Sequence, residues 1–528
     1  MFDELTRLEY IAEDELEESI QCLHLSTPPS PIANSIISII FILTDIMSAP
    51  KILSIPPAEI ISSKSHILPG QLHVTEFFFK VPLDYTGTES GICTKLFARR
   101  VRKHDVPIFP PDDDDNENKP KYDNGEAPKP YMVYLEGGPG FGNREPQDHP
   151  LTSHALARGY QLLLLDHRGV GLSSPISAEV LKQFSPDVQT RAKFIGLMRQ
   201  DNTVRDCEAV RKCLTASWPA SKQAWSIFGQ SYGGFVSLSY LSMHPEGLRE
   251  VFLTGGLAPV GKEPDSVYEA TFRRVVERNK QYYEKFPEDV ENVRQIAGFI
   301  ESQGGKIPLP SGGVLTVPRL LTMGISFGGH GGFDSVHSTI LTLKTSLDFF
   351  GFFTRASLVP LEGWTPFDTN IIYAILHEAI YCDGPGVASR WSANSVGRSL
   401  EAFDWLNSDL STASTSGPLY FSGEMIFPFH FETYPELQML REEAELIANR
   451  EDWPALYDQE KLRKNKVPVY AASYVEDMYV DYNFARDTAK LVKGTKTFET
   501  NVMYHSALRA KADEVLHQLF SLRDDVID

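Results

Sequence analysis

The chain has 528 residues, of which 42% are hydrophobic and 23% charged, and its formal net charge is −20. This length exceeds that of one compact domain, so we expect a large domain together with a second one. Phosphate groups bind to clustered lysine and arginine side chains, which this acidic chain does not supply. The composition therefore argues against nucleic acid and anionic membranes as partners, and a substrate with a cationic group suits the charge better.

The cysteines are odd in number and scattered, without a CxxC pair. This pattern indicates neither a disulfide framework nor a zinc site. A reducing compartment is the simpler interpretation, and we expect a cytoplasmic protein. The five residues are Cys22, Cys93, Cys207, Cys213 and Cys382.

An N-terminal extension, residues 1–48, carries an apolar run from Ile32 to Met47. The run is shorter than the roughly 20 residues of a membrane-spanning helix. The residues ahead of it are acidic, whereas a secretory signal begins with a basic region. We therefore expect a non-catalytic extension and no membrane partner. A chain that starts at Met47 should still fold and be active.

Two β-rich runs, His73 to Leu83 and Thr94 to Val101, predict an antiparallel hairpin ahead of the main sheet. Residues 104–130 contain four consecutive aspartates together with many Pro and Asn residues. Such a composition cannot bury apolar surface, so it predicts a solvated acidic loop rather than a metal site.

The next part of the chain alternates short apolar segments with helical stretches, such as Asn202 to Leu214 and the segment just after Ser231. Continuous apolar runs bounded by turn residues are typical of a parallel sheet buried on both faces. The order predicts an α/β fold. The apolar segments are Tyr131–Leu135, Gln161–Leu165, Trp225–Phe228 and Val251–Thr254.

Beyond residue 258 the strand pattern gives way to helical, aromatic-rich sequence that begins with Ser266 to Phe286. We interpret it as an inserted helical cap domain. Apolar strands resume at Val467 to Ala472 and at Thr497 to Val502, and a helix is expected from Ala510 to Leu522. The expected division is an extension (1–48), a first core part (49–258), a cap (259–447) and a second core part (448–528).

The segment Gly229-Gln230-Ser231-Tyr232-Gly233-Gly234 follows the apolar strand WSIF and leads into a helix. This is the context of a G-x-S-x-G nucleophile elbow. A serine on such a tight turn has a strained backbone, and the glycines avoid collisions with the neighbouring strand and helix. Ser231 is therefore the candidate nucleophile. A Gly/Ser-rich turn without chemistry is the alternative.

A second glycine-rich segment, Glu136-Gly137-Gly138-Pro139-Gly140, follows the strand YMVYL, where this fold places half of the oxyanion hole. We expect the backbone amides of Gly138 and Tyr232 to stabilise the oxyanion. A plain Gly/Pro turn is the alternative.

The third motif, residues 166–173, follows the strand QLLLL, and we expect its Asp166 and Arg168 to brace loops. His167 precedes the serine, whereas the fold orders its triad as Ser, then Asp or Glu, then His.

That order directs attention to the C-terminal strands. Asp477 is the expected acid, with Glu476 and Asp481 as alternatives, and His505 is the expected base after the last strand. His517 falls within the terminal helix, where a surface position is expected. This chemistry requires neither a metal nor an organic cofactor.

Together, GGPG, DHRGVGLS and GQSYGG resemble the prolyl aminopeptidase (proline iminopeptidase) family of α/β-hydrolases, from roughly Leu72 to Leu522. The resemblance implies a serine aminopeptidase that releases an N-terminal residue, preferably proline, from small peptides with a free N-terminus through an acyl-enzyme. The family has histidine before GGPG where this chain has Glu136, which bears on substrate preference more than on catalysis.

The resemblance also implies glutamates in the cap that bind the substrate's amino group. Glu378, in an apolar helical stretch, and Glu424, among aromatic residues, are the candidates, and Glu136 is a further substrate-binding candidate. A buried carboxylate needs a partner, and a substrate ammonium or an internal Arg390 would supply one. Residues 328–332 (GGHGG) lack the other features of a phosphate loop and are expected to be a turn.

Two other functions remain open on the sequence. One is a carboxylic-ester hydrolase with the same triad. The other is a non-catalytic binding protein of the same fold, although an intact Ser, Asp and His in the right order argue against it. The sequence is compatible with an oligomer.

Overall fold

The computed structural model of the chain describes residues 54–86, 91–104, 129–407 and 417–526. The predictions for the extension (1–48) and for nearly all of the acidic loop (104–130) lie outside the described residues. In the ranges that are described, no helix is long and apolar enough to cross a membrane.

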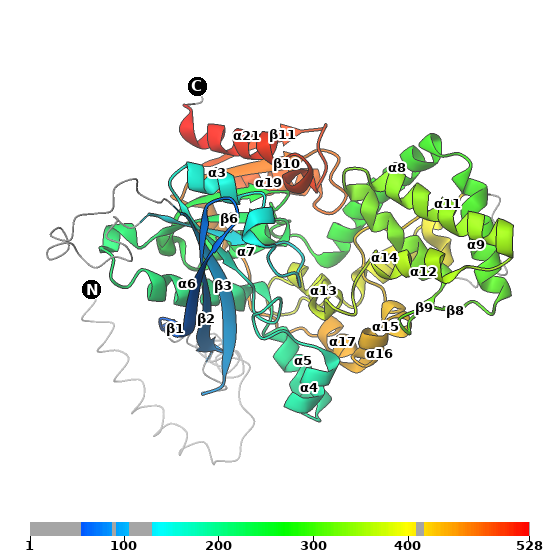
Figure 1. Cartoon of the computed structure of the whole chain (residues 1–528), viewed down its shortest axis with the longest axis horizontal. Helices are drawn as coiled ribbons and strands as arrows, with labels where there is room; N and C mark the ends of the chain where they lie inside the picture. Colours follow the sequence, from blue (N-terminus) through cyan, green and yellow to red (C-terminus); the bar gives the residue numbers. More distant parts are fainter. Residues whose placement is uncertain (1–53, 87–90, 105–128, 408–416, 527–528) are drawn as a thin grey trace, which may run out of the picture. The chain divides into compact units, whose positions relative to one another are not determined.

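A nine-stranded sheet with the order β1-β2-β3-β5-β4-β6-β7-β10-β11 is the main structural element (Figure 1). β1, β2, β3 and β5 pair antiparallel, and the pairs from β5 to β11 are parallel. This mostly parallel sheet with flanking helices confirms the predicted α/β class. The strands are β1 (Glu59–Leu68), β2 (Leu72–Pro82), β3 (Cys93–Lys103), β4 (Tyr131–Leu135), β5 (Gln161–Leu165), β6 (Trp225–Gln230), β7 (Leu248–Thr254), β10 (Val469–Tyr474) and β11 (Thr495–Thr500).

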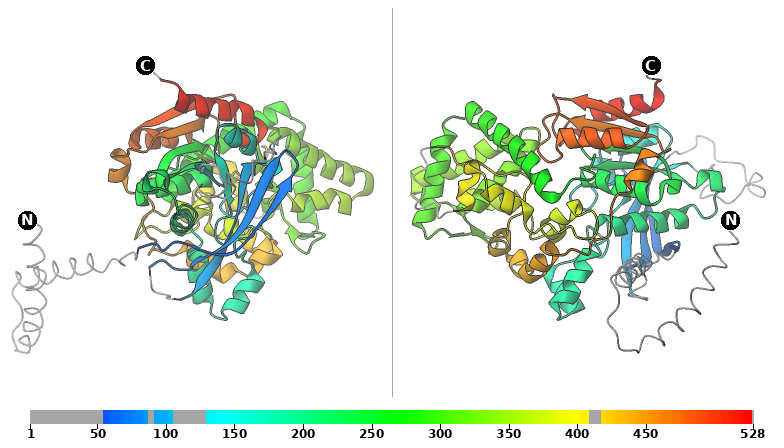
Figure 2. Two further views of the ribbon diagram at one scale, coloured as in Figure 1. Left: turned by 60° about the vertical axis from the view of Figure 1, so that its left-hand side comes forward. Right: turned by 180° about the vertical axis from the view of Figure 1, so that it is seen from behind.

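Both faces of the sheet are covered, which explains why its central strands are apolar throughout. Successive side chains of a strand point to opposite faces. In β4, Met132 and Tyr134 therefore pack with the helices α3 and α21, whereas Val133 and Leu135 pack with α6 and α7. Figures 1 and 2 show α21, in red, against β10 and β11.

The three core helices predicted from the sequence correspond to α6, α7 and α21 to within a few residues, and the other core helices were not predicted. Several of them begin at a side chain that caps the helix, as Asp481 does by accepting the Phe484 N–H at 3.0 Å. The core helices are α3 (Thr152–Ala157), α4 (Ala178–Phe184), α5 (Val188–Gly196), α6 (Gln200–Leu214), α7 (Tyr232–Met243), α18 (Gln459–Arg463), α19 (Tyr482–Leu491), α20 (Ala507–Ala510) and α21 (Ala512–Asp524).

Strand β1 was not predicted. It forms one edge of the sheet and pairs only with β2, so most of its side chains, EIISSKSHIL, are exposed. An edge strand of this kind needs no apolar face, and its mixed polar and apolar sequence does not alternate regularly, so it gives no strand signal.

Between β7 and β10 the chain is mainly helical, and Figure 1 and the right-hand view of Figure 2 show these green to orange helices gathered together. We call residues 259–447 the inserted segment. The GGHGG turn predicted there is found between a 3-10 helix that ends at Gly328 and α11. The helices are α8 (Pro264–Lys285), α9 (Asp289–Ser302), α10 (Val317–Leu321), α11 (Gly332–Phe350), α12 (Arg355–Glu362), α13 (Ile371–Leu376), α14 (Ser392–Arg398), α15 (His430–Thr433), α16 (Pro435–Gln438) and α17 (Arg441–Ala448), with a small hairpin of β8 (Ile307–Pro308) and β9 (Val314–Leu315).

The strand order reverses direction at β4, because β5 and β6 lie on its two sides. Ligands of open α/β sheets bind at such a switch point, outside the carboxyl ends of the strands. The segments that follow β4 and β6 are the two glycine-rich motifs found in the sequence, which makes this edge the place to look for the site.

Candidate active site

Ser231 lies on the sharp turn between β6 and α7. Its φ of 54° and ψ of −123° are strained values for a residue other than glycine. The turn is so tight that a Cβ atom on Gly233 would lie 1.9 Å from the Leu135 carbonyl oxygen, and one on Gly229 2.4 Å from the Gly233 oxygen. The two flanking glycines are therefore a steric requirement of the turn.

A chain of hydrogen bonds joins Ser231, His505 and Asp477. The His505 Nε2 lies 2.8 Å from the Ser231 Oγ, and its Nδ1 lies 2.7 Å from the Asp477 Oδ2. The other carboxylate oxygen of Asp477 accepts the backbone N–H groups of Tyr479 and Val480, at 2.8 and 3.1 Å. The three side chains follow β6, β10 and β11, whose carboxyl ends lie at one edge of the sheet, with β7 between β6 and β10.

The other acids considered for this position are engaged elsewhere. Glu476 forms an ion pair with Arg274 at 2.9 Å, and Asp481 caps α19. His517 is an exposed residue of α21. Of the acids weighed in the sequence, Asp477 alone contacts His505.

The charges around His505 favour its protonated form. Burial by itself would lower the pKa of His505, but the charge of Asp477, its hydrogen bond and the charge of Glu424 outweigh burial and hold the pKa above its ordinary value. At His167 no charged group offsets burial, so burial lowers its pKa to about 4. Of these two histidines, His505 is therefore the one that readily accepts a proton, as a general base must.

Ser231 and His505 open into a pocket of about 220 Å³. It contains one anionic side chain, Glu424, and one cationic side chain, Arg509. Its remaining walls are largely aromatic and glycine-rich. They comprise Gly137, Gly138, Phe141, Gln230, Ile325, Trp364, Thr365, Pro366, Phe367, Tyr373, Tyr479 and Ser506.

Glu424 reaches this pocket from the inserted segment. Its Oε1 accepts a hydrogen bond of 2.6 Å from the Tyr373 hydroxyl. Burial raises the pKa of Glu424 to about 7, against the opposing effects of His505 and of the Tyr373 hydrogen bond. A partly desolvated carboxylate beside a nucleophile is well placed to accept a cationic group.

Glu378, the other candidate for binding the substrate's amino group, does not line the pocket. Its two carboxylate oxygens accept the backbone N–H groups of Ser392 and Ala393, at 3.2 and 2.9 Å, at the start of α14. Burial raises its pKa to about 7. Unpaired N–H groups at a helix start attract a carboxylate, and this explains the position of Glu378. Arg390 pairs with Glu451 instead.

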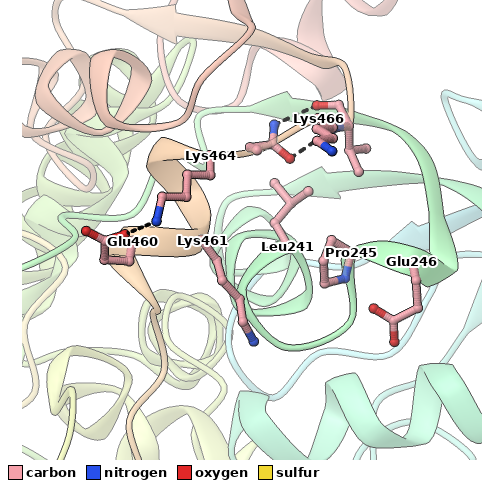
Figure 3. A pocket seen from close by; sticks show the side chains of 9 residues that line it. Leu241, Pro245, Glu246, Glu460, Lys461, Lys464 and Lys466 are labelled. Atoms are coloured by element: carbon pink, nitrogen blue, oxygen red, sulfur yellow. Dashed lines mark hydrogen bonds and ion pairs between the residues drawn. The ribbon is translucent and has the colours of Figure 1, made fainter. Parts of the chain in front are cut away.

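A second pocket, of about 410 Å³, lies at the end of α7 and beside α18 (Figure 3). Lys464 pairs there with Glu460 at 2.6 Å, and Lys461 donates to the Ser242 carbonyl at 3.1 Å. None of its lining residues is a serine, cysteine or histidine, so this pocket has no nucleophile and base of its own. The lining residues are Leu241, Pro245, Glu246, Glu460, Lys461, Lys464, Asn465, Lys466 and Val467.

Within the described ranges, one group has the spacing of a metal site: Glu208, His244 and Glu246. Both oxygens of Glu208 already accept 2.7 Å hydrogen bonds from Arg211, and one also accepts the Tyr240 hydroxyl. A metal ion would have to displace that guanidinium.

Comparisons with known proteins agree with this geometry. A sequence profile described as "alpha/beta hydrolase fold" matches residues 130–303. The proline iminopeptidase aneH of Aspergillus aculeatus is 38% identical over 475 residues, which cover 90% of this chain and 99% of the relative. The proline iminopeptidase of Aeromonas sobria is 36% identical over 465 residues, covering 88% and 100%. The chain belongs to the proline iminopeptidase family. The fold and the family together make it a hydrolase.

A more distant member of the family, the proline iminopeptidase of Neisseria gonorrhoeae, is 27% identical over 128 residues, which cover 24% of this chain and 32% of the relative.

The motif at residues 166–173, D-x-R-G-x-G-x-S, has the bracing contacts expected from the sequence. Arg168 is buried and donates two hydrogen bonds to Asp206, at 2.6 and 2.7 Å. Asp166 accepts the backbone N–H groups of Asn143 and Leu172.

Glu136, at the position where the family usually has histidine, is buried beneath the glycine-rich loop and does not line the pocket. Its Oε1 accepts the Gly137 N–H at 2.8 Å and lies 3.3 Å from an Arg509 nitrogen. The expectation of a substrate-binding Glu136 is therefore not matched by its position. It contacts the loop and the arginine instead.

The two expected oxyanion donors take different places. Gly138 lines the pocket, beside Gly137, whose N–H is already bound to Glu136. Tyr232 is the first residue of α7, so its N–H has no acceptor within the helix. The Tyr232 side chain is buried, and its ring forms a T-shaped contact with that of His167.

Sequence reasoning missed several polar residues of the pocket, among them Tyr373 and Arg509. Arg509 lies in the short helix α20, four residues after His505, and this closeness to the expected base could have indicated that it lies near the site. Tyr373 lies in α13, whose apolar sequence indicates a helix of the hydrophobic core. Nothing in its sequence context indicates that its hydroxyl contacts Glu424.

Proposed function

We propose that the protein is a serine aminopeptidase that releases an N-terminal residue, preferably proline, from peptides with a free N-terminus. The observation that carries the proposal is that the chain Asp477–His505–Ser231 opens into the same pocket as the Glu424 carboxylate. A nucleophile beside an anionic group suits a substrate that has an ammonium next to its scissile carbonyl. The names of the two relatives that match about nine-tenths of the chain support the same reaction.

In the proposed reaction, His505 Nε2 takes the proton of Ser231 as its Oγ attacks the carbonyl carbon. Asp477 holds the proton on Nδ1 and stabilises the charged imidazolium. His505 then gives its proton to the leaving amine, and the acyl-enzyme forms. Water, activated by the same histidine, releases the free amino acid.

The developing oxyanion would be bound by the backbone amides of Gly138 and Tyr232. Fixed donors of this kind are worth several kcal/mol because they are already oriented toward the charge. Glu136 contributes indirectly, because its bond to the Gly137 N–H fixes the loop next to Gly138.

We assign recognition of the substrate ammonium to Glu424 and the role of a cap domain to residues 259–447. The Tyr373 hydroxyl orients the carboxylate through its 2.6 Å hydrogen bond. An arriving ammonium would favour the ionised form of Glu424, whose pKa of about 7 leaves much of it protonated near neutrality.

The preference for proline follows from the walls of the pocket. Phe141, Trp364 and Phe367 present flat apolar surfaces near Ser231 and Glu424. The ring carbons of proline are compact and apolar, so they can be desolvated between such side chains while the ring ammonium pairs with Glu424.

The test is a panel of aminoacyl arylamides with free and with acetylated amino groups. The proposal predicts the highest kcat/KM for the free prolyl arylamide and little hydrolysis of its acetylated form. An ester hydrolase would instead cleave simple acyl esters best and ignore the state of the amino group. A fluorophosphonate probe that labels the wild type but not Ser231→Ala provides the control for the nucleophile.

A further inference from the structure

Arg509 is the cationic side chain of the pocket, and the proposed reaction leaves it without a role. In the part of the chain that the structure describes, its guanidinium has one hydrogen-bond partner, the Glu136 Oε1 at 3.3 Å. The side chain is 45% exposed. A guanidinium carries five N–H donors in a planar fork, so most of them remain available to a ligand.

Arg509 follows closely in the chain on His505, the residue that protonates the leaving group in the proposed reaction, and both line the pocket. His505 Nε2 must reach the leaving nitrogen to protonate it, so the residue that departs lies toward His505. Arg509 lies four residues further along, on α20, and Ser506 between them also lines the pocket. Glu424 comes from the inserted segment and contacts Tyr373 instead.

The pocket therefore combines an anionic and a cationic side chain with the Ser231–His505 pair, in a volume of about 220 Å³. A dipeptide has a matching distribution of charge, with an ammonium, a scissile carbonyl and a carboxylate within two residues. A longer peptide or a C-terminal amide has a neutral group where the dipeptide has its carboxylate.

We propose that Arg509 binds the C-terminal carboxylate of the leaving residue, so that dipeptides are the preferred substrate class. This inference rests on the proposed aminopeptidase function. Arginine is suited to the task because its fork pairs with both oxygens of a carboxylate. Glu136, which is buried, lies 3.3 Å from an Arg509 nitrogen and orients the guanidinium. Its place in the sequence is the one at which this chain departs from the family pattern.

The experiment compares three substrates with the same N-terminal proline: the dipeptide Pro-Ala, its C-terminal amide and the prolyl arylamide. The wild type should prefer the acid over the amide by about tenfold in kcat/KM, since a charged hydrogen-bonded pair is lost in the amide. Arg509→Gln should bring this ratio to about one. Arg509→Lys should give an intermediate ratio, because lysine keeps the charge without the fork.

Arg463→Gln is the matched control, because it makes the same charge change at an exposed position of α18 outside the pocket. It should keep the wild-type ratio. The net charge of −20 would by itself disfavour the acid, so a preference for it requires a local cation.

Equal kcat/KM for acid and amide in the wild type would overturn the inference, as would an acid preference that survives Arg509→Gln. If the arylamide is hydrolysed in either case, the aminopeptidase function stands and only the role of Arg509 fails. If neither the arylamide nor the dipeptides are hydrolysed, the proposed function itself fails.

Discussion

The strand ends of the sheet and the inserted helical segment place their polar residues by different physical means. Ser231, Asp477 and His505 each follow a strand, and the order of the strands brings them into contact. Glu378 and Glu424 both lie in the inserted segment, and burial raises the pKa of each to about 7. One caps a helix and the other lines the pocket. Burial of a glutamate therefore does not indicate whether it lines the pocket, whereas the position of a residue after a strand indicates where its side chain lies.

The largest effects are expected at the strand ends. Ser231→Ala and His505→Gln should each lower kcat by roughly 10⁴- to 10⁶-fold, because residues that act as one unit lose nearly all activity together. Thermal unfolding should show little change in Tm. A variant that keeps substantial turnover on prolyl arylamide would place the nucleophile or the base elsewhere.

The acid can be tested against its neighbour in the sequence. Asp477→Asn should lower kcat roughly 10²- to 10⁴-fold, because the amide cannot stabilise the imidazolium and favours the wrong tautomer. Glu476→Gln removes only a partly exposed pair with Arg274, so its effect should stay within about twofold. The opposite ranking in steady-state kinetics would move the acid by one position.

The two glutamates of the inserted segment form a second matched pair. Glu424→Gln should lower kcat/KM for free-amino substrates about ten- to hundredfold, mainly through KM, because a contact worth about 1.5 to 3 kcal/mol is lost. Hydrolysis of a simple ester should change much less. Glu378→Gln should leave the ratio of kcat/KM for the free-amino substrate to that for the ester at its wild-type value.

If Glu378→Gln lost the preference for free-amino substrates over esters and Glu424→Gln kept it, Glu378 would again be the candidate that binds the amine. Equal losses on both substrate types in Glu424→Gln would indicate a disturbed pocket instead of a lost contact.

The smallest expected effect is on pH dependence. For free-amino substrates, kcat/KM should rise through about pH 7 as Glu424 loses its proton. Loss of the His505 proton, whose pKa lies above its ordinary value, should contribute to the same rise. It should fall again above about pH 8, where an α-ammonium loses its proton. With a simple ester as substrate, only the rise on the acidic side of the pH profile, its acid limb, should remain. Since the charge of Glu424 raises the pKa of His505, Glu424→Gln should move that limb to lower pH. An unmoved limb would contradict the coupling.

Much of the core could be predicted because local sequence carries the signals. The apolar run Tyr131–Leu135 is identical to the observed strand, and the elbow glycines are required by contacts that any residue with a Cβ would break. Asp477 and His505 followed from the order of the triad and from the position of the last two strands, although the sequence left Glu476 open as the acid.

The remaining features depend on tertiary contacts that leave no local pattern. Strand β1 lies at the sheet edge with most of its side chains exposed, so it has no regular apolar pattern. Glu378 contacts a helix that begins 14 residues later, and Arg509 meets Glu136 across 373 residues of chain. Neither pairing is encoded in the sequence next to the residue itself.

The most direct test of the account is a crystal structure of Ser231→Ala with the intact dipeptide Pro-Ala. We predict the substrate's ammonium at about 3 Å from the Glu424 carboxylate, and its scissile carbonyl oxygen directed toward the Gly138 and Tyr232 amides. An ammonium bound by Glu378, or one that contacts no carboxylate of the inserted segment, would contradict the central claim.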